Sequence, residues 1–284
     1  MLVHISNIDK DYINSAISKV SQLINIPFDV HIYFVNGNYS NLIQSLPINI
    51  KKDIMQLSNK ISFSYSLKDK HYIFIQVKNR KYLLKNKKAL IGLLLHEIFH
   101  TIQRKKGLDK KLKSSYKRFY LSKFSKLNKL DYDKRPLRDL FYVLGENSIL
   151  LAKELYTNTE IIKKGLEDYL IEYYKEEFSN IKICPKPVFY DKFKKAAKKD
   201  MNIIRIAFEF EFALLSIILP LKKIRTKKAR SLEKHIHSCF EINIEDISRK
   251  CREITFTYFE NFHRKNFQKE FFEQVFFKIY NLLM

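Results

Sequence analysis

The spacing of the hydrophobic residues divides the chain into a mixed first part and a helical second part. Up to about residue 107, alternating stretches rich in β-branched and aromatic residues predict strands, and a 3.6-residue spacing of apolar residues predicts the helices between them. The predicted strands are 1–6, 28–35, 61–67 and 71–77, and the predicted helices are 10–24, 50–59 and 81–105. Asn7 or Asp9 can cap the first of these helices.

Beyond Gly107 the hydrophobic pattern is helical throughout. It predicts helices at 108–130, 137–163, 166–178, 188–199, 201–219, 229–238, 244–263 and 266–283, with Gly145 as a candidate break in the second of them. The proline-rich segment 184–187 is the best candidate linker, so we expect a first domain at 1–183 and an all-helical region at 188–284 packed on it. The expected fold class is α+β, with a small mixed or antiparallel sheet packed on the 81–105 helix and a mostly α-helical C-terminal half.

The predicted 81–105 helix contains the motif His-Glu-x-x-His. His96 and His100 are four residues apart, so they project from the same side of a helix and can hold one metal ion between them. Glu97 lies about 100° further round the helix, beside the metal without being a ligand, which suits a general base for a water molecule that the metal activates. The surrounding apolar residues predict a buried helix: Ala89, Leu90, Leu93, Leu94, Ile98 and Ile102. The alternative is a pair of histidines hydrogen-bonded in a core.

A catalytic zinc needs three protein ligands and one open position. The sequence has no histidine between His100 and His235, so the third ligand is predicted to be a downstream carboxylate. The candidates on the next helices are Glu146, Glu154 and Glu160. Glu160 is surrounded by polar and basic residues, which is typical of a solvated charge.

Glu154 has the apolar helical neighbours Leu150, Leu151 and Ile161, and a carboxylate in such a stripe needs a partner or a metal. Glu154 is therefore the favoured third ligand, with Glu146 as the runner-up. Asn158, four residues on, can supply a hydrogen bond that orients the ligand.

The sequence His96-Glu97-x-x-His100, followed by a helix bearing Glu154-x-x-x-Asn158, resembles the gluzincin clan of zinc metallopeptidases. The clan has Glu-x-x-x-Asp on the later helix, so Asn158 is a departure from its pattern. The resemblance implies that His96, His100 and Glu154 hold one Zn²⁺ per chain and that Glu97 is the base in peptide-bond hydrolysis. It covers roughly residues 60–165. The chain is also similar to an uncharacterised archaeal group of zinc-peptidase-like proteins, with Lys-Glu-Leu-Tyr-Thr-Asn at 153–158 as a second landmark.

Peptide hydrolysis also needs a donor for the oxyanion and a place for the substrate. The candidate oxyanion donors are Tyr142, Tyr156, His235 and His237. If the strand at 71–77 lies at the edge of the sheet, its backbone can hold an extended peptide by strand addition. In a non-catalytic alternative, the zinc site is a scaffold and another side chain, such as His235, fills the open position.

The net charge of +23 favours a second class of function, association with nucleic acid. Basic residues gather in the segments 104–118 and 222–230. The simpler interpretation is a composition rich in Lys, Ile and Asn, with solvated basic helix faces. Binding to phosphates predicts an affinity that falls steeply with salt, and a solvated face does not.

Other functional classes lack their sequence features. Five glycines, none in a phosphate-binding pattern, and the absence of Gly-x-Ser-x-Gly argue against a P-loop and a nucleophile elbow. Cys184, Cys239 and Cys251 form no close pair, and the N-terminus lacks the pattern of a signal peptide, so we expect a cytoplasmic protein. The most apolar stretch, 212–221, is about half the length of a membrane span and is predicted to be a buried helix that ends at Pro220.

Overall fold

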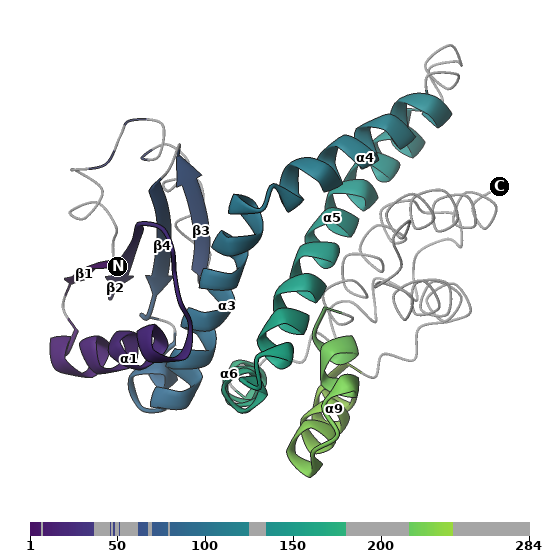
Figure 1. Cartoon of the computed structure of the whole chain (residues 1–284). Coiled ribbons are helices and arrows are strands. Elements are labelled where there is room, and N and C mark those ends of the chain that lie inside the picture. Colours follow the sequence, from purple (N-terminus) through teal and green to yellow (C-terminus); the bar gives the residue numbers. More distant parts are fainter. Residues whose placement is uncertain are drawn as a thin grey trace. The chain divides into compact units, whose positions relative to one another are not determined.

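The computed structural model describes residues 1–36 apart from 7, 62–67, 70–124 apart from 79, 135–179 and 216–240, with the single residues 46, 48 and 51 (Figure 1). The chain forms two compact units, one of residues 1–106 with 160–180 and one of residues 107–159 with 181–284. The predicted helices 188–199, 244–263 and 266–283 and the predicted linker 184–187 lie outside the described residues, as does nearly all of 50–59.

The first unit contains a four-stranded mixed sheet in the order β1-β2-β4-β3. Its strands are β1 (Leu2–Ser6), β2 (Val30–Val35), β3 (Ser62–Leu67) and β4 (Lys70–Gln76). β1 pairs with β2 and β2 pairs with β4 in parallel, whereas β3 and β4 form an antiparallel hairpin. All four strands therefore lie where the alternating pattern predicts them.

A parallel pair of neighbouring strands needs a crossover, and helix α1 (Lys10–Leu23) supplies it between β1 and β2. The helix begins where the sequence predicts, because the Asp9 carboxylate accepts the backbone N–H groups of Asp11 at 2.9 Å and Tyr12 at 3.2 Å. One of the two predicted capping residues is thus confirmed as the cap.

The strand at 71–77, which could add a peptide only if it lay at the edge of the sheet, is an internal strand. β4 pairs with β2 on one side and with β3 on the other, so its ladder groups are already used. The prediction that residues 71–77 could receive a peptide by strand addition is therefore wrong. The error arises from a long-range pairing, because the sequence indicates the hairpin with β3 but not the pairing with the distant β2.

The two faces of the sheet carry different side chains. Ile32, Phe34, Ile73 and Ile75 are completely buried on one face. Ser62 pairs with Ile75, so it projects from that same face. The opposite face carries an aromatic cluster of Tyr33, Tyr72 and Phe74, with Phe63 and Tyr65 packed against it and Leu46 over it.

Helix α3 (Lys87–Lys105) carries the His-Glu-x-x-His motif and contacts α1, α6 and β3. It begins later than predicted, because residues 81–84 form a separate 3₁₀ turn, η1 (Lys81–Leu84). Asn86 caps α3 by accepting the Ala89 N–H at 3.2 Å. The helix ends two residues before Gly107, whose φ of 71° is the left-handed conformation that glycine adopts readily. Residues 89–101 of α3 are buried on all sides.

Helix α6 (Glu167–Ser179) packs closely on α3, and Gly92 explains how. A Cβ at Gly92 would collide with the Tyr169 carbonyl oxygen and lie only 2.8 Å from the Tyr173 Cβ, so only glycine allows the two backbones to approach this closely.

Polar contacts also join α6 to the start of α3. The Asn86 side-chain amide donates to the Glu176 carboxylate at 2.8 Å. The neighbouring Glu177 carboxylate accepts a hydrogen bond from the guanidinium of the buried Arg80.

The second unit is helical in its described residues. It contains α4 (Leu108–Phe124), α9 (Lys227–Phe240) and most of α5 (Arg135–Lys163), which continues from Glu160 into the first unit. α5 runs straight through Gly145, where a Cβ would collide with the ring of Tyr116. The helix before Pro220 continues to residue 223, so the predicted end at Pro220 is wrong.

The expected α+β class with a small mixed sheet and a mostly helical remainder is confirmed in this coarse form. Among the described residues, none of the helices is both long and apolar enough to cross a bilayer.

Candidate metal centre

His96 and His100 lie on the same side of α3, as the four-residue spacing predicts. They are 6% and 7% exposed, and their rings meet edge to face. Their Nε2 atoms are 3.2 Å apart. Two imidazoles bound to one tetrahedral zinc at 2.0–2.1 Å would place these nitrogens about 3.3 Å apart. The pair therefore has the spacing of two zinc ligands.

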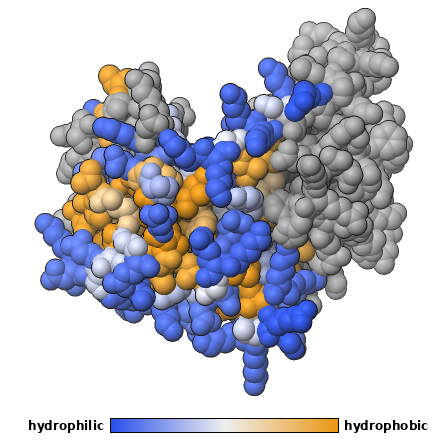
Figure 2. All heavy atoms as spheres, in the orientation of Figure 1, coloured by the Kyte–Doolittle hydropathy of each residue, from blue (hydrophilic) through white to orange (hydrophobic). Residues whose placement is uncertain are grey.

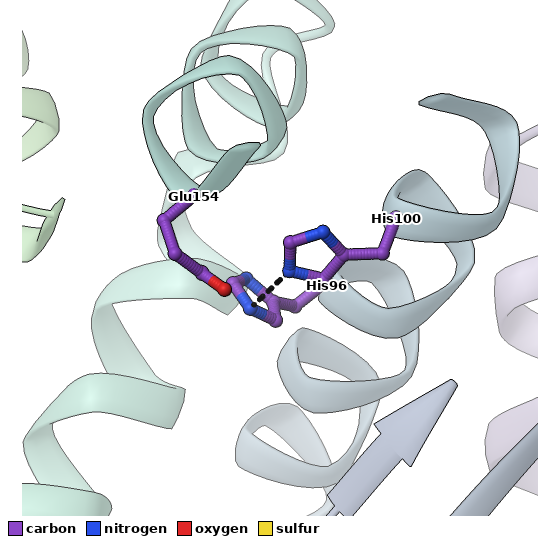
Figure 3. A group of neighbouring side chains, drawn as sticks. All are labelled: His96, His100 and Glu154. Carbon is purple, nitrogen blue, oxygen red and sulfur yellow. Dashed lines mark hydrogen bonds between the residues drawn. The ribbon is translucent and has the colours of Figure 1, made fainter. Parts of the chain in front are cut away.

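A carboxylate oxygen of Glu154 completes the group (Figure 3). One ligand atom from each of His96, His100 and Glu154 lies within 4.8 Å of the others. Two imidazole nitrogens and one carboxylate oxygen form a donor set that zinc takes in catalytic sites.

The apolar surroundings predicted for Glu154 are present only in part. Leu151 and Leu155 are buried, at 2% and 3% exposure, and Ile161 is fully buried. Leu150 is 53% exposed, so its predicted place on the apolar side of α5 is wrong. Next to Glu154, Lys153 pairs with Asp109 at 3.0 Å and joins α5 to α4. Glu146, the runner-up, is not a member of the group.

Asn158 has a structural partner that the sequence did not suggest. It is fully buried, and its amide donates to the carbonyl oxygen of Ser216 at 2.9 Å. Ser216 is four residues before Pro220, which has no N–H to donate to this carbonyl within the helix. Asn158 therefore satisfies an acceptor that Pro220 leaves unbonded. Its predicted role in orienting Glu154 stays a prediction.

Glu97 is held by a strand residue. It is 6% exposed, and its Oε1 accepts a hydrogen bond from the Ser62 hydroxyl at 2.8 Å. Sequence reasoning missed Ser62. The signal was nevertheless present in β3, where Ser62, Ser64 and Ser66 alternate with Phe63, Tyr65 and Leu67. A serine face that packs on a buried helix indicates polar partners there.

Two tyrosines of α6 lie beside the histidine pair and were also missed. The ring centroid of His96 is 6.0 Å from that of Tyr173 and 6.4 Å from that of Tyr174. Both tyrosines are buried. Gly92, one turn before His96, was the available signal, because a glycine inside a strong helix indicates a close neighbour.

The predicted oxyanion donors are Tyr142, Tyr156, His235 and His237. Tyr156 is half-buried on α5, and His235 is exposed on α9. The side chains of Tyr142 and His237 lie outside the described residues. Assignment of an oxyanion donor stays a prediction.

The basic segments are at the surface. Seven of the eight basic residues in 104–118 and all six in 222–230 are exposed. Figure 2 shows hydrophilic side chains over much of the described surface on the face drawn, around apolar patches. This exposure suits a solvated face and a polyanion-binding face equally.

Comparison of the chain with protein-family models, with curated proteins and with solved structures found no match.

Proposed function

We propose that this chain is a zinc-dependent hydrolase of the gluzincin type, cleaving peptide bonds, with one zinc held by His96, His100 and Glu154. The observation that carries the proposal is the 3.2 Å separation of two buried Nε2 atoms with the Glu154 carboxylate beside them. The small sheet packed on α3 through β3 fits the zincin-like catalytic domain that the sequence resemblance implies.

The donor set fits zinc on chemical grounds. Imidazole and carboxylate are borderline and hard ligands that zinc accepts, and three protein ligands leave a fourth position open. Zinc bound there supplies Lewis acidity, which polarises a carbonyl group and makes water acidic near neutral pH.

Glu97 is the general base. It takes a proton from the attacking water and delivers it to the leaving amine, a role suggested by its place directly after His96 on α3. The burial of residues 89–101 excludes bulk water from the helix and strengthens electrostatic interactions around the site.

The test is metal analysis of purified protein combined with cleavage of a peptide library. We expect about one zinc per chain in the wild type. Glu97→Gln should keep the zinc and lower cleavage by roughly 10²–10⁴-fold, the usual contribution of a general base.

Glu154→Ala should lose zinc, whereas Glu146→Ala, a change of the same size on the same helix, should retain it. An unchanged rate in Glu97→Gln contradicts the assignment of the base. Protein that neither contains nor binds zinc contradicts the whole proposal, including the non-catalytic form of the site.

A further inference from the structure

Ser62 is the first residue of β3 and its side chain leaves the sheet on the α3 side. Its hydroxyl is 2.8 Å from Oε1 of Glu97, within ordinary hydrogen-bond distance. A hydroxyl that donates to an ionised carboxylate makes one of the stronger hydrogen bonds in proteins. The contact joins two elements that are 35 residues apart in sequence.

The position of Ser62 is fixed from two sides. Its backbone pairs with Ile75, which is completely buried near the C-terminal end of β4. The next residue, Phe63, stacks on Phe74 across the hairpin, with ring centroids 4.8 Å apart. The hydroxyl therefore belongs to a rigid strand and not to a loop, which suits a group that must hold another in one orientation.

We propose that Ser62 is a positioning residue for Glu97, which rests on the proposed function. Its hydroxyl occupies Oε1 and holds the carboxylate in a single orientation, so that the second oxygen is presented for proton transfer. Without Ser62 the carboxylate of Glu97 rotates among several orientations, and fewer of them are productive.

A merely structural role for Ser62 is the competing explanation, because a buried carboxylate needs a donor in any case. The two roles differ in what they change. Both roles lower stability when Ser62 is removed, but only a positioning role also lowers kcat, with KM and zinc content unchanged, whereas a structural role spares the rate of the folded protein.

The experiment compares Ser62→Ala, Ser62→Thr and Ser64→Ala with the wild type. Ser64 is the matched control, since it lies on the same face of β3 two residues further on. Ser62→Ala should lower kcat by roughly 10- to 100-fold with unchanged KM and zinc content. Ser62→Thr, which keeps a hydroxyl, should restore most of the rate, and Ser64→Ala should have wild-type kcat.

A second readout does not depend on activity. In urea unfolding, Ser62→Ala should shift the unfolding equilibrium roughly tenfold in the wild type and far less in Glu97→Ala, because the two side chains share one interaction. If the wild type is active and Ser62→Ala is equally active, the role of Ser62 is overturned and the proposed function stands. An absence of coupling to Glu97 also overturns the role of Ser62. An inactive wild type that shows the coupling instead overturns the proposed function, and with it the catalytic meaning of this contact.

Discussion

Gly92→Ala is expected to destabilise the first unit, although alanine is the better helix former. Gly92 lies inside α3, and α6 packs directly over it. The added methyl group would collide with the backbone carbonyl oxygen of Tyr169 and lie 2.8 Å from the Tyr173 Cβ. A backbone atom cannot rotate away as the end of a long side chain can, so α6 itself has to move.

Two effects of opposite sign decide the magnitude. Replacing glycine by alanine in a helix interior contributes about 1 kcal/mol of stability. Carbon atoms pack best at about 3.5–4.0 Å, so the 2.8 Å contact to Tyr173 requires a shift of roughly 1 Å, and overpacking of this kind costs about 1–3 kcal/mol or more. Because the collision also includes the Tyr169 carbonyl, we place the cost at the upper end. The net loss is then about 2 kcal/mol, or a fall in Tm of roughly 5–10 °C.

The assay is thermal unfolding of the full chain followed by circular dichroism, with Gly145→Ala as the matched control. Gly145 is also an internal helix glycine, but its neighbour is the ring of Tyr116, which can rotate about its own side-chain bonds. Gly145→Ala should therefore lose less stability than Gly92→Ala. A Tm for Gly92→Ala at or above the wild-type value would show that α6 does not approach α3 in this way.

Two further predictions concern a buried amide and a half-buried histidine. Asn158→Ala removes the hydrogen-bond donor to the Ser216 carbonyl, which Pro220 cannot replace, so the free energy of unfolding in urea should fall by about 1–3 kcal/mol. The same change made in a Pro220→Ala background should cost less, and an equal cost in both backgrounds would contradict this pairing. Burial, aided by His4, lowers the pKa of His31 below its ordinary 6.5, so the unfolded chain binds more protons and the free energy of unfolding should rise with pH between the lowered pKa and 6.5. His31→Gln should flatten this part of the pH profile, and an unchanged slope in urea titrations would assign it to another group.

The local features of the site could be predicted from the sequence because each depends on residues close together in the chain. The four-residue spacing of His96 and His100, the cap at Asp9 and the stop at Gly107 are all set within one or two helical turns. The β3–β4 hairpin is similarly local. Glu154 was selected from its neighbours on one helix, although Leu150, one of those neighbours, proved to be exposed.

The features that were missed depend on which distant elements meet. The internal place of β4 follows from its pairing with β2, and the tyrosines beside His96 follow from the packing of α6 on α3. Ser62 reaches Glu97 only because the hairpin lies against the motif helix. Hydrophobic periodicity tells which face of an element is buried but not against what, so these contacts could not be read from it.

The histidine pair has two physical interpretations that differ in protons. Without a metal, two Nε2 atoms 3.2 Å apart form a hydrogen bond only if one ring carries its proton on Nε2 and the other does not. Such a hydrogen-bonded pair does not require a third group, yet a carboxylate oxygen of Glu154 lies within 4.8 Å of both nitrogens. With zinc bound, both nitrogens and the Glu154 oxygen would be ligands of the same cation, which would satisfy all three groups together. The Glu154 carboxylate is therefore the feature that favours the proposed metal centre over a hydrogen-bonded histidine pair.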